Sequence, residues 1–236
     1  MSCRATGKGH PTAIMEIIHP NVDRSLAIWE IGSVITSCLI AEWVVTAVVG
    51  VSSWLIAVPV VFAFGFMFLS HRIRSESLSE IGFRFDNFGQ ALRLLILPMV
   101  LATVILLGIG YFNHSIDFFR WRGGGALLGM PLLGMLWGLV QQYALQGFIN
   151  RRAQIAWGRG LVSVVLVAVL FGCFHLPNPT LVVATFLGGL VWATVYQRAP
   201  NLFALAISHG VMTWILISTL PSSWLHSLRV GYKFIG

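Results

Sequence analysis

The chain has 236 residues, of which 57% are hydrophobic and only 10% are charged, with a formal net charge of +7. Soluble domains carry about 25% charged residues, so this composition excludes an ordinary soluble domain. The positive charge does not indicate a nucleic-acid-binding protein, because the 15 Lys and Arg lie between apolar segments and act as topology signals.

Apolar segments of about 20 residues recur along the sequence, and each is long enough to cross a hydrocarbon core of about 30 Å. The expected fold class is all-α, a polytopic transmembrane helical bundle of about seven spans. Residues 1–24 are predicted to form a cytoplasmic N-terminal arm, residues 25–220 a single transmembrane domain, and residues 221–236 a short tail.

The spans are predicted in chain order from the apolar segments. They comprise residues 25–50, 52–70 and 89–112, a fourth span that starts near Gly125, and residues 161–175, 180–196 and 201–220. The polar segment 71–93 is predicted to form a short helix or turn at the membrane surface, and 113–124 a loop. Pro177 and Pro179 end the fifth span, because proline breaks a helix interior.

Most Lys and Arg lie in the segments on the N-terminal side of this arrangement. Because cytoplasmic loops are enriched in these residues, the N-terminus is predicted to be cytoplasmic. The expected location is a bacterial inner membrane, with the chain as a multi-pass integral protein.

The fourth span is interrupted by three glutamines, Gln141, Gln142 and Gln146. Polar side chains at membrane depth are costly unless they have partners. If the fourth and fifth spans turn back near Arg159, Gln142 and His175 lie at one level. These residues are then either functional or ordinary hydrogen-bonding groups between helices.

His209 completes this predicted polar layer from the last span. It lies nine residues after Pro200, about 13 Å along a helix. Gln142 lies nine residues before Arg151, at a similar depth. Thr213 lies one turn beyond His209, and Phe171 one turn before His175.

The order of these residues resembles that of the CAAX-protease and bacteriocin-processing family, intramembrane endopeptidases also called type II CAAX prenyl endopeptidases or abortive-infection proteins. The resemblance covers about residues 79–214. The family pattern is EExxxR, FxxxH and HxxxN on successive helices. This chain has QQYALQ over 141–146, FGCFH over 171–175 and HGVMT over 209–213.

The resemblance implies a role for each motif position. Gln141 and His175 would activate the hydrolytic water, and His209 and Thr213 would stabilise the oxyanion. The remaining positions, Gln142, Gln146 and Phe171, would bind substrate or support the site. A glutamine amide cannot accept a proton near neutral pH, whereas a positioned general base contributes about 10²–10⁴-fold.

Another carboxylate is available only from earlier spans, because Asp117 is the last acidic residue. Glu30 and Glu42 lie within the first span, where either could reach the polar layer as a base or as a hydrogen-bonding group. Zinc at His175 and His209 is a further alternative, but catalytic zinc usually has three protein ligands. No cofactor is therefore expected.

The expected function is an intramembrane endopeptidase that acts on membrane-associated peptides or proteins, with weak or no activity because the glutamate pair is replaced. The alternative is a catalytically inactive relative, a membrane scaffold or regulator that binds peptides or lipidated tails. A small transporter that uses the polar layer is a third hypothesis. The expected partners are a membrane-associated substrate and the lipid bilayer.

Overall fold

A computed structural model describes residues 12–50, 54–120 and 126–235, and side chains from residue 22 onward except 126–131. Every regular element in these ranges is a helix, which confirms the predicted fold class. Five helical segments are long and apolar enough to cross a membrane: Val22–Val49, Trp54–Ile73, Phe88–Phe112, Pro179–Arg198 and Leu202–Thr219. Leu161–Cys173 is a shorter apolar helix. The chain is therefore a multi-pass membrane protein.

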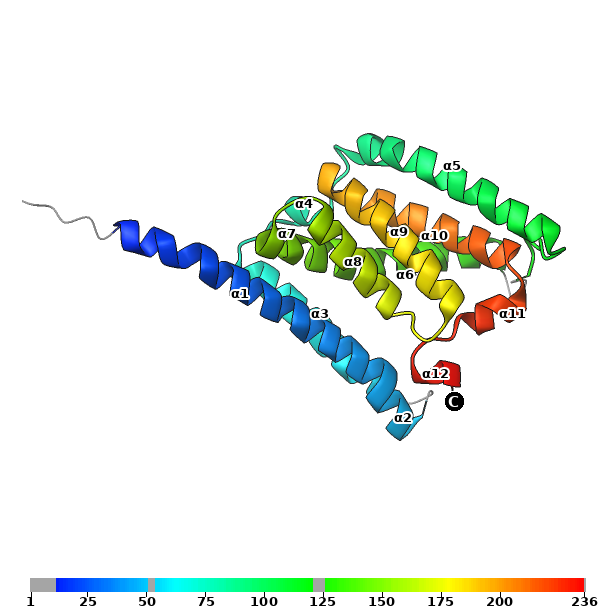
Figure 1. Ribbon diagram of the computed structural model, residues 1–236, viewed down its shortest axis with the longest axis horizontal. Coiled ribbons are helices and arrows are strands. Elements are labelled where there is room, and N and C mark those ends of the chain that lie inside the picture. The colour runs from blue at the N-terminus through cyan, green and yellow to red at the C-terminus, as the bar shows by residue number, and fades with distance from the viewer. Residues whose placement is uncertain (1–11, 51–53, 121–125, 236) are drawn as a thin grey trace, which may run out of the picture.

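The first two spans form a helical pair that lies side by side in Figure 1. They comprise α1 (Thr12–Leu39), the π-helix η1 (Ile40–Val45), α2 (Thr46–Val49), the 3₁₀ turn η2 (Trp54–Ile56) and α3 (Ala57–Ile73). Of the predicted N-terminal arm, residues 1–11 lie outside the described residues, and the rest continues into the first span as α1.

A short surface helix, α4 (Leu78–Ile81), follows α3. The Ser77 hydroxyl accepts a hydrogen bond from the Glu80 backbone N–H, and the Glu80 carboxylate accepts one from the Ser77 N–H. This reciprocal capping explains why the helix begins here. The predicted short helix within 71–93 is therefore present.

The third span and the glutamine-containing helix come next. They are α5 (Phe88–Phe112) and a continuous rod of α6 (Ala126–Gln142), the π-helix η3 (Tyr143–Asn150) and α7 (Arg151–Trp157). The rod ends at the glycine-containing turn of residues 158–160, where the chain reverses as predicted near Arg159.

The remaining helices complete the bundle. They are α8 (Leu161–Cys173), α9 (Pro179–Arg198), α10 (Leu202–Thr219), α11 (Ser222–Leu225), the 3₁₀ turn η4 (His226–Leu228) and α12 (Tyr232–Ile235). Asn178 and Asn201 cap the N-termini of α9 and α10 by accepting backbone N–H groups. α10 packs against α6 and α5, and α8 against α9 (Figure 1).

Two glycines allow α6 and α10 to approach closely. A Cβ at Gly138 would lie 3.1 Å from the Ala206 carbonyl oxygen, and one at Gly210 would lie 2.8 Å from the Met135 backbone nitrogen. Small residues at such crossings let membrane helices pack backbone to backbone. This close crossing brings Gln142 of α6 beside His209 of α10.

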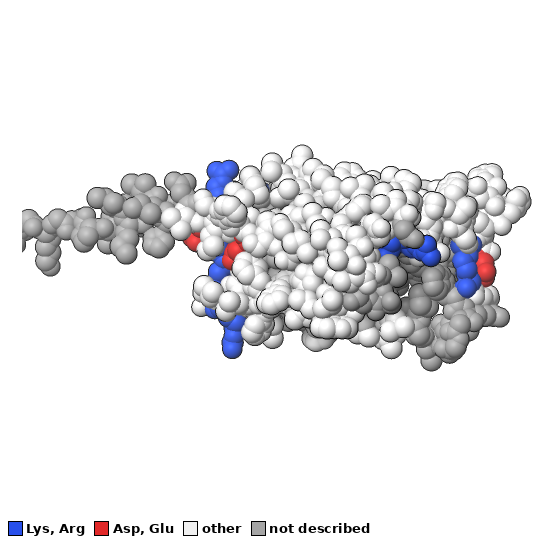
Figure 2. Space-filling view, turned by 90° about the horizontal axis from the view of Figure 1, so that it is seen from below, with Lys and Arg blue, Asp and Glu red and all other residues white. Residues whose placement is uncertain are grey.

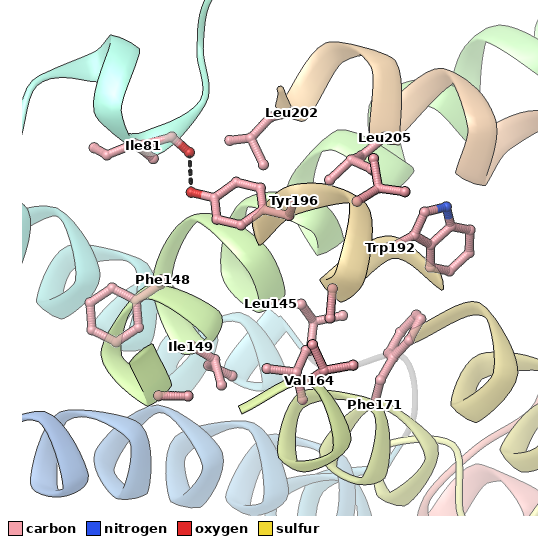
Figure 3. Close-up of a cluster of buried hydrophobic side chains, with 14 of the residues drawn as sticks. Ile81, Leu145, Phe148, Ile149, Val164, Phe171, Trp192, Tyr196, Leu202 and Leu205 are labelled. Atoms are coloured by element: carbon pink, nitrogen blue, oxygen red, sulfur yellow. Dashed lines mark hydrogen bonds between the residues drawn. The ribbon is translucent and has the colours of Figure 1, made fainter. Parts of the chain in front are cut away.

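The hydrophobic core lies where η3, α8, α9 and α10 meet (Figure 3). Phe148, Leu205 and Leu202 are fully buried there. The Tyr196 hydroxyl donates a hydrogen bond to the Ile81 carbonyl oxygen at 2.6 Å, which attaches α4 to this core. Figure 2 shows long uncharged surfaces between separate groups of charged side chains, as a membrane-embedded bundle requires.

A buried ionic cluster joins the first two spans to α7. We call it the Glu–Arg cluster, and its members are Glu30, Ser70, His71, Arg74, Glu76, Arg151 and Arg152. Arg152 is 0% exposed and lies at its centre. Its Nε is 2.8 Å from Glu30 Oε2, and its Nη1 and Nη2 donate to the Glu76 carboxylate at 2.9 and 2.8 Å.

This placement corrects the interpretation of the basic residues as topology signals alone. Arg152 is buried, and its guanidinium is surrounded by two carboxylates, the Ser70 hydroxyl and the ring of Phe148, 4.8 Å away. A guanidinium is suited to such a site because its fork of donors satisfies several acceptors at once.

Glu76 makes the stability of this cluster dependent on pH. Burial raises the pKa of Glu76, but hydrogen bonds from His71 and from the two neighbouring arginines outweigh it and hold the pKa well below its usual range. A lowered folded-state pKa stabilises the fold above the unfolded-state value and loses that contribution as the pH falls.

We therefore expect the thermal unfolding temperature in detergent micelles to fall below about pH 4, the range in which an unfolded glutamate takes up a proton. The Glu76→Gln variant should have a lower unfolding temperature than the wild type at pH 7. Its unfolding temperature should also fall less on acidification. If the unfolding temperatures of the wild type and the variant fall in parallel as the pH is lowered, Glu76 is not the acid-sensitive group.

Candidate functional site

The polar layer centres on a hydrogen bond between α6 and α10. Gln142 Nε2 lies 3.1 Å from His209 Nδ1, and both residues are buried. Gln142 Oε1 is fully enclosed and has no hydrogen-bond partner among the described residues. The amide therefore donates to the imidazole and retains an unpaired acceptor.

Aromatic rings fix the orientation of the His209 imidazole. The Trp192 ring stacks on it with centroids 4.6 Å apart and an interplanar angle of 12°. Phe171 contacts its edge at 5.9 Å. Trp192 Nε1 donates to the Ser208 hydroxyl at 2.9 Å, which anchors the indole. The imidazole is thus held between two helices in one orientation.

His175 also contacts the Phe171 ring, and it lies just beyond the last residue of α8. The two ring centroids are 5.0 Å apart, and His175 Nδ1 is 2.8 Å from the Phe171 carbonyl oxygen. One phenyl ring therefore contacts both imidazoles.

The hydrogen-bond partners define opposite tautomers for the two imidazoles. The Phe171 carbonyl can only accept, so His175 Nδ1 is protonated and its Nε2 has a free lone pair. The Gln142 amide nitrogen can only donate, so His209 Nδ1 accepts and its Nε2 is protonated. In the neutral state, one ring can accept a proton and the other can donate a hydrogen bond.

Gln146 belongs to a second, neutral network below this layer. Its Oε1 accepts from Asn150 Nδ2 at 2.7 Å, and Asn150 Oδ1 accepts from Gln197 Nε2 at 3.1 Å. Gln197 Nε2 also donates to the Ser163 hydroxyl at 2.8 Å. Gln146 Nε2 is enclosed and has no hydrogen-bond partner in the part of the chain that the structure describes. The network joins η3, α8 and α9 without any charge.

The other two motif residues, Gln141 and Thr213, take no part in these hydrogen bonds. Gln141 and Thr213 are half-buried, and neither makes a side-chain hydrogen bond with the residues that the structure describes. Both are thus free to contact a substrate or water. Gln142 is the glutamine that touches an imidazole, while the predicted catalytic role of Gln141 stays a prediction.

The neutral character of the site is its main chemical property. α6 to α10 contain no acidic residue, since Asp117 is the last one in the chain. Within the described residues, no three His, Cys, Asp or Glu side chains gather as a metal-ligand set. The available groups are two imidazoles, which can exchange protons, and three glutamines and a hydroxyl, which can donate and accept hydrogen bonds.

These features define a polytopic membrane protein in which a glutamine and two histidines from separate helices gather around one phenyl ring. Residues 123–215 match the family described as Type II CAAX prenyl endopeptidase Rce1-like, and this segment contains all three motifs. The match covers this segment of the chain, from just before α6 to within α10. No curated protein and no solved structure matched the chain.

Sequence reasoning missed the residues that support the layer. Trp192, which stacks on His209, and Asn150 and Gln197, which form the neighbouring network with Gln146, were not singled out. Asn150 and Gln197 are polar residues near the ends of apolar segments, which was the available signal. The sequence around Trp192 gave no such signal, because aromatic residues are common in apolar helices.

Proposed function

We propose that this protein is an intramembrane endopeptidase of low turnover that acts on membrane-associated peptides or proteins. The observation that supports it best is the pair of opposite tautomers at His175 and His209 around one phenyl ring. The family name points to the prenylated C-terminal tail of a protein as the substrate class.

His175 would act as the general base. A water oxygen attacks the carbonyl carbon of the scissile peptide, and the water proton passes to His175 Nε2. The oxyanion accepts a hydrogen bond from His209 Nε2–H and from the Thr213 hydroxyl. The C–N bond then breaks, and the proton on His175 is transferred to the leaving amine, which restores the neutral imidazole.

The glutamines make the reaction slow. Gln141 can orient the attacking water through its amide but cannot take the water proton, so the histidine acts without the usual carboxylate. Losing a positioned general base costs about 10²–10⁴-fold in rate. Gln142 and Gln146 hold the helices in register without the charged pair of the family motif.

The charge bias supports an N-terminus in the cytoplasm, with the Glu–Arg cluster at the cytoplasmic end of the bundle. His175 lies fourteen residues after the first residue of α8, Leu161, about 21 Å along the helix axis. A substrate tail would therefore have to enter the bundle laterally or from one end.

A second candidate is favoured by the neutral layer itself. A site without a carboxylate can bind a peptide amide through the half-buried side chains of Gln141 and Thr213, which make no side-chain hydrogen bond with the described residues. In this case the protein is a non-catalytic scaffold or regulator that holds lipidated tails.

A cleavage assay distinguishes the endopeptidase from the non-catalytic scaffold. Purified protein in liposomes is incubated with a quenched-fluorescent farnesylated peptide, alongside the His175→Ala and Gln141→Glu variants. We expect slow cleavage, a loss of at least about 10²-fold with His175→Ala, and a gain of about 10²-fold with Gln141→Glu. Wild-type inactivity with unchanged peptide binding would favour the scaffold.

A further inference from the structure

Two enclosed polar atoms on one helix have no hydrogen-bond partner among the described residues: Gln142 Oε1, an acceptor, and Gln146 Nε2, a donor. Both side chains are 0% exposed. The two residues are four positions apart, and side chains at this spacing are neighbours, with about 5–6 Å between their Cβ atoms. Because unpaired polar groups are costly to bury, this acceptor and this donor require a partner that can serve both.

One water molecule has the properties that this pair of atoms requires. It can donate to Gln142 Oε1 and accept from Gln146 Nε2, and internal waters in proteins bind buried groups of this kind. A cation would be repelled by the Gln146 amide hydrogens, and an anion by the Gln142 oxygen. A peptide group does not fit, because both atoms are fully enclosed.

Backbone groups fix the orientation of the amides beyond Gln146. The Gly160 N–H can only donate, so Gln197 Oε1 accepts from it at 2.9 Å and Gln197 Nε2 donates to Asn150 Oδ1 at 3.1 Å. The Ala193 carbonyl can only accept, so Asn150 Nδ2 lies toward it, at 3.3 Å. The same Nδ2 donates to Gln146 Oε1 at 2.7 Å. Gln146 Nε2 is therefore the donor that faces away from this network.

A water next to Gln146 Nε2 extends this order of donors and acceptors to His209. It accepts from Gln146 and donates to Gln142 Oε1, so the Gln142 amide nitrogen faces His209 Nδ1, 3.1 Å away. Turning the Gln142 amide over would direct its NH₂ group at the water, whose own hydrogens would then bind neither glutamine oxygen. His209 Nδ1 therefore accepts, and its Nε2 carries the proton.

We propose that one internal water joins Gln146 to Gln142, and that Gln146 and Asn150 are positioning residues that determine through it which nitrogen of His209 is protonated. We call Gln197, Asn150, Gln146, the water and Gln142 the amide chain, which runs from the turn after α7 to His209. The effect on cleavage rests on the proposed function, in which His209 Nε2–H binds the oxyanion. The water site and the tautomer of His209 do not depend on it.

The test uses the full chain labelled with ¹⁵N-glutamine and ¹⁵N-histidine in detergent micelles. It compares the wild type with Gln146→Met, which keeps most of the side-chain volume and removes the amide. The matched control is Gln154→Met, because Gln154 also donates to Asn150 Oδ1, at 3.1 Å, but lies outside the amide chain. We expect a cross-peak between water and the Gln146 side-chain amide hydrogens in the wild type and in Gln154→Met.

The imidazole signals of His209 give a second readout, because ¹⁵N shifts distinguish a protonated ring nitrogen from an unprotonated one. The His209→Asn variant identifies these signals by their loss. We expect one tautomer, with Nε2 protonated, in the wild type and in Gln154→Met. Gln146→Met should add the signals of the other tautomer, because the Gln142 amide can then turn over. A wild type without the water cross-peak, or His209 signals unchanged by Gln146→Met, would overturn the inference.

Cleavage gives a third readout. Gln146→Met should lower kcat for the farnesylated peptide by about 10-fold with KM unchanged, less than the roughly 10²–10³-fold lost when an oxyanion donor is removed. Gln154→Met should cleave like the wild type. Equal losses of kcat in the two variants would contradict a positioning role for Gln146. If the wild type cleaves nothing, the proposed function fails, and the water cross-peak and the His209 signals still decide the inference.

Discussion

Replacing Arg152 by Met is expected to lower the free energy of unfolding by about 3–5 kcal/mol, because it leaves two buried carboxylates without their shared partner. Arg152 is fully buried and binds Glu30, Glu76 and Ser70 at once. Methionine fills most of the volume of the arginine side chain. The loss in free energy of unfolding therefore comes from the missing charge and not from a cavity. Unfolding by SDS titration in mixed micelles measures it.

Two further variants test this explanation. Arg152→Lys keeps the charge but not the fork of donors, and we expect an intermediate loss. Arg72→Met, at an exposed arginine of α3, should cost under about 1 kcal/mol. Equal losses for Arg152→Met and Arg72→Met would mean that the Glu–Arg cluster does not join the first spans to α7.

The second large effect is expected from restoring the family charges. Gln142→Glu alone should lower the free energy of unfolding by about 3–5 kcal/mol, because it places an unpaired charge in a fully buried position. Adding Gln146→Arg, four residues later on the same helix, should recover about 1–3 kcal/mol, a typical coupling energy between contacting residues. The pair would replace two neutral amides by an ion pair.

A double-mutant cycle measures this coupling by the same SDS titration. The matched control combines Gln142→Glu with Gln154→Arg, whose arginine lies about 18 Å further along the helix. That combination should show no coupling. If the coupling energy of Gln142→Glu with Gln146→Arg equals that with Gln154→Arg, positions 142 and 146 do not act together as the site of one ion pair.

The membrane class and the motif order could be read from the sequence. Apolar segments of spanning length, the glycine-containing turn near Arg159 and the depth of Gln142 and His209 all follow from residue spacing. The structure joins Gln142 to His209 and places His175 beside the Phe171 ring. Spacing along a helix is local information, and a fixed rise per residue converts it into depth.

The lateral contacts could not be read in this way. Arg152 looked like an interfacial topology signal, yet it is buried against Glu30 and Glu76 from two other segments. Glu42 looked equivalent to Glu30, yet only Glu30 belongs to the Glu–Arg cluster, while Glu42 lies beside Gly231 of the tail. Depth alone places Arg152 correctly near one end of the bundle but does not say what it touches.

The sequence by itself determined how deep each polar group lies and that the first motif is neutral. Only the tertiary structure decided which groups meet at each depth, which tautomer each imidazole adopts, and where the remaining carboxylates are. The physical reason is that lipid tails are as apolar as a leucine-rich interface, so hydrophobic periodicity does not distinguish a helix surface that faces lipid from one that faces another helix. That choice is made by close contacts between helices far apart in the chain, such as the crossing of α6 and α10 at Gly138 and Gly210.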